Sequence, residues 1–575
     1  MLRKKFIIFL IVLFISSMPA FAAENQDIGT DIGGMVNKLV EDGKSKGAVL
    51  SVIQDGELIL CNGYGFADEY HNIASDGELT AFRIGSVSKT FAAVAAQILN
   101  QQGRLDMNSD ISVYLKDNIP GLKYPVTMHQ LLTHTAGFEE LMTGIAVLDV
   151  SDAEPLAVSL HKYMPEQIFK PGESSSYSNY GIALAAYVVE TIAEIPFSQF
   201  CMENIFLPLD MNRTTYEYMH DVVYVSSAYL PDGRETREPY INLYPEGSAV
   251  STAEDMAKYM SWLLDDTDNR VLSGKYKAEL FEKQFSMSPE LEGTGYVWSR
   301  KERNGKIYYD KKGETLNFYT RIALYPEENA GIFLSFNTYV PENEINDVMM
   351  KAVDLLYGKQ EEEIKGEVNS SIDVRGIYVN NWSSVKTPEK ILSCLIPGKM
   401  LNIKETGGDI LLNGEKISLI GDDMYSSFMG KIKFIDKDDS IIIATESPLT
   451  YSRVSFLQSK IIQACVLILF IASAFVCLIM GIVDKKMIFI AAALIQILSI
   501  LGLCLLVLNG IQNYSILQYA CYMSISGWLI AASCVSGVIY TVMMKINSNK
   551  TSIIYKVWSL SGILFIAWLF NFNII

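Results

Sequence analysis

The chain has few cysteines outside its apolar C-terminal part. Of eight in 575 residues, only Cys61, Cys201 and Cys394 lie there. Three widely separated thiols do not make a disulfide framework, and their spacing matches no metal-binding motif. The sequence therefore predicts no metal and no other cofactor. A single disulfide bond among the three is left open.

The chain also has no excess of basic residues over acidic ones. The formal net charge is -18, from 47 Lys and Arg against 65 Asp and Glu, and the soluble part carries most of that excess. Acidic surfaces do not attract the phosphates of nucleic acids or anionic lipid headgroups. We therefore expect no nucleic-acid partner, and we interpret the charge as a means of solubility.

The N-terminus has the pattern of a signal peptide over residues 1–22. A basic stretch (3–5) precedes a short apolar core (6–15) and an Ala-x-Ala cleavage site (20–22). The alternative is an uncleaved anchor, although the apolar core is short for a membrane span. We expect the mature chain to begin near Ala23.

The C-terminal part, residues 456–575, contains four apolar segments of about the length that crosses a bilayer. They lie near residues 461–483, 487–508, 518–543 and 557–574. The first and third loops between them carry lysines and the second carries none, which predicts cytoplasmic first and third loops and an extracytoplasmic N-terminal part. No segment has a charge at its centre, which favours a lipid-embedded anchor over a transporter.

The rest of the chain divides at a charged stretch. Residues 30–357 alternate helical and strand-like runs, residues 358–371 form a polar linker, and residues 372–455 contain short strands between turns, which predicts a small all-β domain. A hairpin is expected at Val49–Leu60, around the turn Asp55-Gly56.

Further elements follow from apolar runs and turn residues. Helices are expected at Thr90–Leu99 and Tyr180–Ile192. Two strands, Arg321–Tyr325 and Ile332–Phe336, are expected on either side of a turn at 326–329.

Ser86 and Lys89 form an S-x-x-K pair within FRIGSVSKTF, residues 82–91. Positions i and i+3 share one face of a helix, so a helix starting at Ser86 would place Lys89 one turn deeper, against the hydroxyl. A serine needs an adjacent base, and a desolvated lysine can lose its proton near neutral pH. The apolar run after Lys89 predicts such burial. The same spacing occurs at Ser159–Lys162 and Ser383–Lys386, so the pair alone is weak.

Tyr177 and Asn179 form a Y-x-N pattern in SSSYSNYG, residues 174–181. A tyrosine that shares a proton with lysine can relay the serine proton to a leaving group. Asn179 can hold Lys89 and a substrate amide. Tyr240–Asn242 and Tyr378–Asn380 show the same spacing, so this pattern is also common.

Lys311-Lys312-Gly313 fits K-x-G at the start of an expected edge strand. The Lys311 cation can orient a carboxylate or an acyl oxygen, and Gly313 lets a substrate backbone approach closely. The N–H of Glu314, with that of Ser86, would form an oxyanion hole. An ordinary basic turn is the alternative for this motif alone.

Order and flanking residues make these motifs specific. FRIGSVSKTF resembles the nucleophile segment of the serine β-lactamase and DD-peptidase superfamily, most closely that of class C β-lactamases and penicillin-binding-protein homologues. Four blocks resemble its other signatures in the right order: VTMHQLLTHTAGF (126–138), PGESSSYSNYGIALAAYVVE (171–190), IFLPLDMNRTTY (205–216) and SAVSTAEDMAKYM (248–260). The resemblance covers about residues 30–355.

The resemblance implies an α/β (α+β) fold, with an antiparallel sheet flanked by helices and an all-helical subdomain. It implies that Ser86 is acylated and that Lys89 and Tyr177 share general-base and general-acid work. Substrate-binding roles fall to Asn179, Lys311, Gly313 and Glu314. His134 stands in a block that is structural in the family, so we expect it to be packed rather than catalytic.

Two departures predict an unusual pocket. Lys312 stands where the family has Thr or Ser, a residue that helps to bind a substrate carboxylate, and residues 314–318 replace a glycine-rich stretch. We expect these changes to affect the recognition of β-lactams more than the acyl-transfer chemistry. We therefore expect a peptidase, carboxypeptidase or amidase acting on D-amino-acid-containing peptides or related acyl compounds.

Several alternatives remain at this point. One is a catalytically weak penicillin-binding or sensor protein. Another is an esterase or a prodrug-activating peptidase of a natural-product pathway. A third makes the helix bundle the functional part, as a transporter or channel, although its lack of central charges weakens that reading.

Overall fold

The computed structural model describes most of the chain outside the N-terminus and the later apolar segments. The described residues are 28–115, 121–142, 144–217, 223–359, 372–395, 398–437, 440–487, 489–491, 493–498, 500–501 and 553–572. The predicted signal peptide, the apolar segment 518–543 and nearly all of the predicted linker lie outside them.

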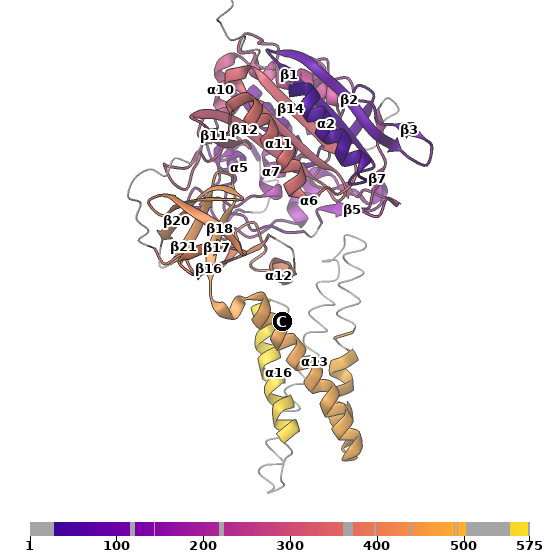
Figure 1. The fold of residues 1–575 in the computed structure, drawn as a ribbon, viewed down its shortest axis with the longest axis vertical. Coiled ribbons are helices and arrows are strands. Elements are labelled where there is room, and N and C mark those ends of the chain that lie inside the picture. Colours follow the sequence, from indigo (N-terminus) through magenta and orange to yellow (C-terminus); the bar gives the residue numbers. More distant parts are fainter. Residues whose placement is uncertain are drawn as a thin grey trace, which may run out of the picture.

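A seven-stranded antiparallel sheet organises the N-terminal domain, residues 28–357 (Figure 1). Its strand order is β11-β12-β13-β14-β1-β2-β3. The strands are β1 Gly47–Gln54, β2 Glu57–Asp68, β3 Ile73–Ala74, β11 Ser299–Arg303, β12 Lys306–Glu314, β13 Tyr319–Tyr325 and β14 Ala330–Phe336. The predicted hairpin is confirmed, because β1 and β2 pair around Asp55 and Gly56, both at positive φ. The two predicted strands around 326–329 are β13 and β14.

The two faces of the sheet bury different cores. In β1, Leu50 and Val52 face one core and Val49 and Ile53 the other, because successive side chains alternate between faces. Helices α2 (Ile28–Glu41) and α11 (Glu342–Tyr357) cover the first face, side by side in Figure 1. Most remaining helices pack on the second: α3 Lys89–Gln101, α5 Met128–Leu132, α6 Leu156–Lys162, α7 Asn179–Ala193, α8 Phe197–Cys201, α9 Ala253–Leu264 and α10 Gly274–Phe281.

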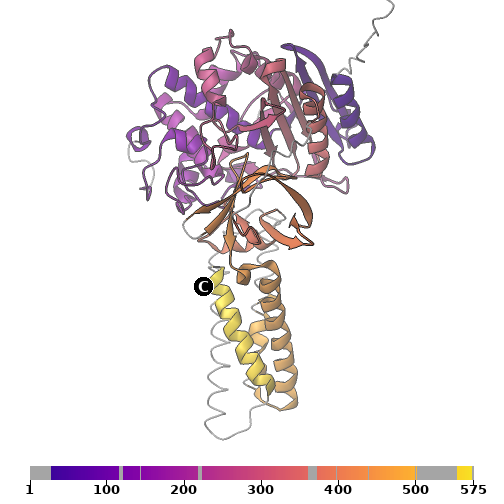
Figure 2. The same ribbon diagram turned by 60° about the vertical axis from the view of Figure 1, so that its left-hand side comes forward.

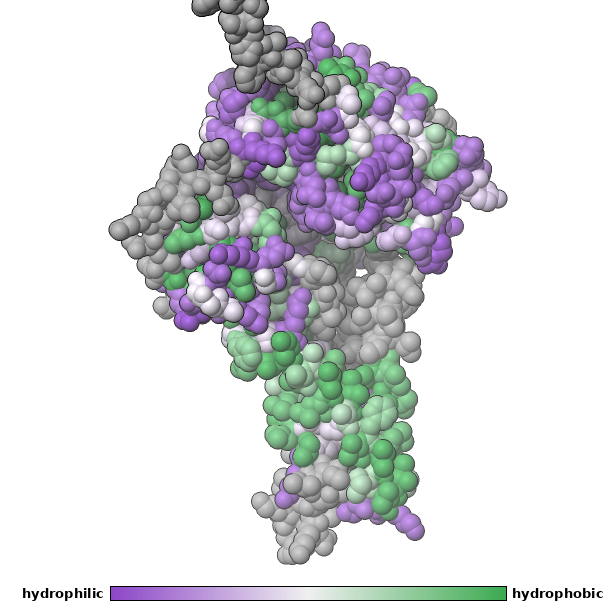
Figure 3. Space-filling model, viewed as in Figure 1, coloured by the Kyte–Doolittle hydropathy of each residue, from purple (hydrophilic) through white to green (hydrophobic). Residues whose placement is uncertain are grey.

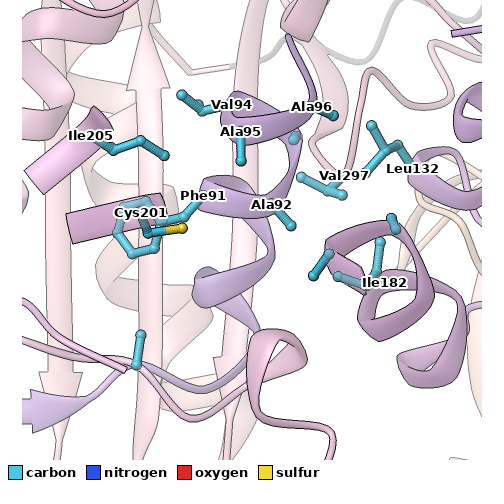
Figure 4. Packing of buried hydrophobic residues seen from close by; sticks show 14 of the residues in the cluster. Phe91, Ala92, Val94, Ala95, Ala96, Leu132, Ile182, Cys201, Ile205 and Val297 are labelled. Carbon is cyan, nitrogen blue, oxygen red and sulfur yellow. The ribbon is translucent and has the colours of Figure 1, made fainter. Parts of the chain in front are cut away.

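Helix α3 lies in the middle of the larger core. Phe91 and Ala95 face the side of Cys201 and Ile205, while Ala92 faces Ile182 on α7 (Figure 4). The small residues of α3 let neighbouring helices approach closely, and nearly the whole helix is buried. The predicted helices at 90–99 and 180–192 are α3 and α7. Among the described cysteines, all are free thiols, including Cys61 and Cys394.

The predicted small all-β domain is a closed eight-stranded barrel, called the barrel below. Its strands are β15 Gly376–Asn380, β16 Met400–Thr406, β17 Asp409–Leu412, β18 Glu415–Gly421, β19 Met424–Ser427, β20 Gly430–Lys437, β21 Ser440–Thr445 and β22 Thr450–Val454. Tyr378, Leu401, Tyr425, Phe434 and other apolar side chains fill its interior. The barrel lies between the N-terminal domain and the C-terminal helices (Figures 1 and 2).

Two apolar helices extend from the barrel and form a hydrophobic surface (Figure 3). They are α13 (Lys460–Val483) and α16 (Ile553–Asn571), joined by stacking of Phe470 on Phe565. Within the described part of the chain, α13 is the one unbroken helix long and apolar enough to cross a membrane. A shorter apolar helix at 489–498 falls within the second predicted span.

Candidate active site

Ser86 lies in a tight turn at the entrance of α3. A 3₁₀ helix, Gly85–Ser88, leads directly into α3 at Lys89. Gly85 has φ +50°, and a Cβ there would lie 2.6 Å from the nitrogen of Glu314. Only glycine fits this position, because the turn is pressed against the end of β12. Helical structure therefore includes Ser86, and Lys89 lies one turn beyond it as expected, although the first turn is 3₁₀ rather than α.

Lys89 contacts the serine from inside the domain. Its side chain is fully buried, as predicted, and its Nζ donates to Ser86 Oγ at 2.8 Å. The same ammonium donates to the Glu246 backbone oxygen at 2.6 Å and to Glu246 Oε2 at 2.8 Å.

The expectation that burial would free Lys89 of its proton is wrong for this site. Burial acts to lower the pKa of Lys89, but the nearby charge of Glu246, helped by Tyr177, more than offsets it and raises the pKa above its ordinary value. Lys89 is therefore an ammonium group in the resting site.

Tyr177 is held between aromatic rings and two lysines. Its ring stacks on His134 at 4.3 Å between centroids, and the Nζ atoms of Lys89 and Lys311 lie 5.2 and 5.1 Å from its centroid. Burial raises the pKa of Tyr177, although the charge of Lys89 and a hydrogen bond with Ser86 oppose that shift. Tyr177 therefore also keeps its proton at neutral pH.

His134 packs as expected of a structural residue. Its Nδ1 accepts from the Ser178 N–H at 3.2 Å, and its backbone oxygen accepts from the Ser176 N–H at 2.9 Å. Burial and the charges of Lys311 and Lys89 hold its pKa well below the ordinary value. The ring is therefore neutral and supports Tyr177 by stacking.

The K-x-G motif lies at the end of β12 and not at its start, which corrects the prediction. Strand β11 pairs with β12 only as far as Asp310, so residues 311–314 have a neighbour on one side alone, β13. The Lys311 side chain is buried beside Tyr177. The Lys312 side chain is 44% exposed and forms an ion pair with Glu342 on α11. Because successive side chains alternate, Lys312 faces away from the site and does not shape the pocket.

Gly313 is needed for a different contact from the one expected. A Cβ at Gly313 would lie 2.0 Å from the Ile84 oxygen and 3.0 Å from the Val87 nitrogen. The glycine therefore lets β12 approach the nucleophile turn rather than a substrate backbone. This approach is what brings the Glu314 nitrogen beside the turn that carries Ser86.

Asn179 opens α7 and is fixed by a buried carboxylate. Its Nδ2 donates to Glu140 Oε1 at 2.8 Å, and its backbone N–H donates to Glu140 Oε2 at 3.3 Å. Among the described contacts, Asn179 has no hydrogen bond to Lys89, so the expectation that Asn179 holds Lys89 is wrong. Glu246 holds Lys89 instead. The Asn179 Oδ1 atom is buried and has no hydrogen-bond partner in the structure.

The structure thus brings Ser86, Lys89, Tyr177 and Lys311 together and adds two carboxylates that sequence reasoning missed. Glu246 contacts Lys89 across 157 positions, and Glu140 contacts Asn179 across 39. Both glutamates are nearly or fully buried, which is unusual for this residue type without a partner. No local pattern pointed to these pairings, although Glu140 directly follows the 126–138 block.

This arrangement suits acyl transfer. A serine hydroxyl, a buried ammonium–carboxylate pair and a phenol converge at one point, so a nucleophile and a proton path are both present. Among the described residues, no group of three or more His, Cys, Asp or Glu side chains could hold a metal ion. Burial, with the charge of Lys89, lowers the pKa of Lys311 well below its ordinary value.

Comparison with known proteins places these observations in a family. Residues 33–353 match the beta-lactamase family. A Staphylococcus aureus protein, Protein flp, is 25% identical over 333 residues, which are 55% of this chain and 65% of that protein. A Bacillus subtilis protein provisionally named penicillin-binding protein PbpX is 29% identical over 258 residues, covering 44% of this chain and 61% of its own. The chain thus spans slightly less than two thirds of these relatives.

Solved structures show the same fold at low identity. The octameric penicillin-binding protein homologue from Pyrococcus abyssi has a TM-score of 0.51 and 21% identity, covering 74% of this chain and 100% of its own. SurE has a TM-score of 0.52 and 16% identity, covering 74% of this chain and 99% of its own. Each of these two structural similarities extends over more of this chain than the family match does, which covers residues 33–353.

Proposed function

This chain belongs to the beta-lactamase family of serine hydrolases, and we propose that it is a membrane-anchored hydrolase that forms an acyl-enzyme on Ser86. The proposed substrates are D-amino-acid-containing peptides or related acyl compounds, cleaved as a peptidase, carboxypeptidase or amidase would cleave them. Lys89 and Tyr177 move protons, and Asn179, Lys311 and Glu314 form the substrate-binding part of the site, while Gly313 lets β12 lie against the serine turn.

One contact carries this proposal. The Lys89 ammonium lies 2.8 Å from Ser86 Oγ inside a fully buried pair with Glu246. Burying a lysine beside a serine costs free energy unless the charge is paired, and the domain supplies the pair at this point. A purely structural lysine would be satisfied by its bonds to Glu246 and would not also need to contact a serine in a tight turn.

The proton of Ser86 needs a relay, because Lys89 holds a proton in the resting site. In the proposed step, Lys89 passes one proton to the Glu246 carboxylate 2.8 Å away, and its amine then takes the Ser86 proton. Ser86 Oγ forms a bond to the substrate carbonyl carbon, and the N–H groups of Ser86 and Glu314 receive the oxyanion. When the tetrahedral intermediate collapses, the bond between the carbonyl carbon and the leaving group breaks, and Tyr177 donates a proton to that group and takes one from Lys89, which recovers its own proton from Glu246. Water then attacks the acyl carbon, and as the ester bond breaks, a proton from the water reaches Ser86 Oγ through Tyr177 and Lys89.

Lys311 supports recognition of a negatively charged substrate group. Its amine is buried, and within the described contacts no carboxylate lies within ion-pair distance of it. A carboxylate on the substrate would supply the missing partner, since Lys311 lies beside Tyr177. Because Lys312 faces α11, its unusual identity does not argue against this recognition.

A slow penicillin-binding protein is the second candidate. The pairing of Lys89 with Glu246 favours it, because a lysine that must first lose a proton to a carboxylate is a slow base for acylation and deacylation. Both candidates form a covalent bond to Ser86 and differ in how long it lasts.

Intact mass spectrometry of the detergent-solubilised chain tests the proposal directly. Exposure to a fluorophosphonate is expected to add one phosphonyl group with loss of hydrogen fluoride, and exposure to a penicillin, in a separate sample, to add the whole reagent mass. Peptide mapping is expected to place each adduct on Ser86. The Ser86→Ala variant should remain unmodified. Decay of the penicillin adduct within minutes would favour a turnover enzyme, and persistence for hours the slow binder. An unmodified wild-type chain with both reagents would contradict acyl-enzyme formation.

The C-terminal part is proposed as a multi-pass anchor with the catalytic domain on the extracytoplasmic side. Support comes from the apolar character of α13 and α16 and from the lysines at 485 and 486, directly after α13. The third proposed span, and residues 502–508 of the second, lie outside the described part.

Reporter fusions test this topology. A green fluorescent protein fused after Lys486 is expected to be fluorescent, because that loop is cytoplasmic, and alkaline phosphatase fused there is expected to be inactive. Fusions after Asn513 should behave in the opposite way. Active phosphatase after Lys486 would reverse the proposed orientation.

A further inference from the structure

The connection between β15 and β16, residues 381–399, reaches out of the barrel onto the N-terminal domain. The N–H groups of Val385 and Lys386 donate to Glu139 Oε2 at 2.6 and 2.8 Å. In the other direction, the Met142 N–H donates to Glu389 Oε2 at 2.7 Å. These contacts join the connection, called the barrel loop below, to the segment that follows the 126–138 block.

The barrel is also joined to the residues just before Tyr177. Ser176 Oγ donates to the Asn381 oxygen at 3.0 Å, and Thr450 Oγ1 donates to the Ser175 oxygen at 2.7 Å. All four residues are buried. Buried, paired polar groups on both sides mark a fixed interface rather than a surface contact, since an unpaired group there would cost free energy.

Trp382, in this barrel loop, lies against the catalytic phenol. Its ring meets that of Tyr177 edge to face, with centroids 5.1 Å apart. The Lys399 ammonium lies 3.7 Å from the Trp382 centroid and also donates to the Trp382 backbone oxygen, which fixes the indole in place. Trp382 as a whole is only partly buried.

The barrel loop also acts on Asn179 through Glu140. Ser384 Oγ donates to the Glu140 backbone oxygen at 2.5 Å. Burial raises the pKa of Glu140 to about 7, and the charge of Lys399 opposes this shift and favours the carboxylate that holds Asn179. The barrel therefore contributes an aromatic side chain and a positive charge to the surroundings of the site.

Side chains fill the centre of the barrel. Apolar side chains from most of its strands meet there, among them Tyr378, Leu412, Phe434 and Ile443. An eight-stranded barrel is just wide enough for such packing. The contacts with the N-terminal domain come from the outer surface and loops of the barrel.

We propose that the barrel forms one wall of the acyl-binding pocket and that Trp382 limits the length of the acyl group bound beside Tyr177. This inference rests on the proposed acyl-enzyme at Ser86. His134 and Trp382 flank the Tyr177 ring, and Lys89 and Lys311 lie close to the same ring, so rings and cations bound the space around the phenol. The pocket takes short acyl groups, such as a single amino-acid residue, and excludes long alkyl chains.

The test compares p-nitrophenyl acetate with p-nitrophenyl octanoate on the detergent-solubilised full chain. Wild type is expected to favour the acetate. Trp382→Ala is expected to raise kcat/KM for the octanoate relative to the acetate at least about tenfold, within the range that a few methylenes contribute in an apolar pocket. Trp382→Phe should keep most of the wild-type ratio. Trp382→Leu gives an intermediate volume and replaces the alanine variant if that variant does not fold.

Lys433→Ala is the matched control, because it removes another contact of the same interface, the 2.7 Å ion pair with Glu290, without touching Trp382. The Lys433→Ala variant should leave the ratio of kcat/KM for the octanoate to kcat/KM for the acetate unchanged. The role of Trp382 in size selection would be overturned if this ratio stayed unchanged in Trp382→Ala. It would also be overturned if kcat/KM fell equally for both esters in the alanine and phenylalanine variants. If wild type forms no fluorophosphonate adduct on Ser86, the proposed function itself fails, which is a separate result.

Discussion

Replacing Lys89 by methionine is expected to lower the rate of Ser86 acylation by about 10²- to 10⁴-fold, the range for loss of a general base. The same change should destabilise the N-terminal domain by about 3–5 kcal/mol, because it leaves the Glu246 carboxylate buried without its ammonium partner. Methionine matches the length of lysine, so lost packing contributes little. Fluorophosphonate labelling rates and thermal unfolding of the detergent-solubilised chain measure the two effects.

The double variant Lys89→Met with Glu246→Gln separates chemistry from stability. A neutral amide beside a thioether removes the unpaired charge, so most of the lost stability should return while acylation stays low. If Lys89→Met is as stable as the wild type, the ammonium–carboxylate pair is not an important source of stability. If the double variant acylates at the wild-type rate, Lys89 is not in the proton path.

Replacing Arg321 by methionine is the second change with a large expected effect, a loss of about 3–5 kcal/mol at pH 7. Arg321 holds Asp310 with two hydrogen bonds, of 2.6 and 2.9 Å, and both side chains are buried. This pair lies on the face of β12 opposite Lys311. Its loss should therefore disturb the strand that presents Lys311 and Gly313 to the site.

The pH dependence of this effect has a defined sign. Burial alone would raise the pKa of Asp310, but Arg321 and Lys301 more than offset it and hold the pKa well below its usual range. A carboxyl group with a depressed pKa stabilises the fold above its unfolded pKa, near 4, and this contribution is lost as the pH falls below that value. Without Arg321, Asp310 is protonated at a higher pH.

The difference in stability between wild type and Arg321→Met should consequently be largest near pH 7 and shrink towards pH 3. Thermal unfolding across this range measures it. Adding Asp310→Asn to Arg321→Met should recover much of the loss at pH 7 and flatten the pH dependence. A difference that stays constant from pH 7 to pH 3 would show that lost packing, and not the charge pair, is responsible.

Much of the architecture could be predicted from local patterns. The β1–β2 hairpin follows from Asp55-Gly56 between apolar runs, and α3 and α7 follow from long apolar helical stretches. The barrel was predicted as a small all-β, barrel-like domain from short strands between turns, and β15 pairing with β22 at the other end of the domain closes it. The position of the K-x-G motif along β12 was placed wrongly, because element boundaries depend on packing partners that sequence patterns do not specify.

By itself the sequence determined which segments would carry the site: the serine turn before a buried helix and the tyrosine before α7, since each is part of an extended block, and the lysine of β12, which follows those blocks in a K-x-G motif. Only the tertiary structure decided the chemistry around them. Glu246 keeps Lys89 charged from 157 positions away, and the barrel docks beside Tyr177 through contacts such as that of Ser176 with Asn381, 205 positions apart. The physical reason is that a buried group's charge depends on the few atoms packed against it, and those atoms come from wherever the fold brings the chain together.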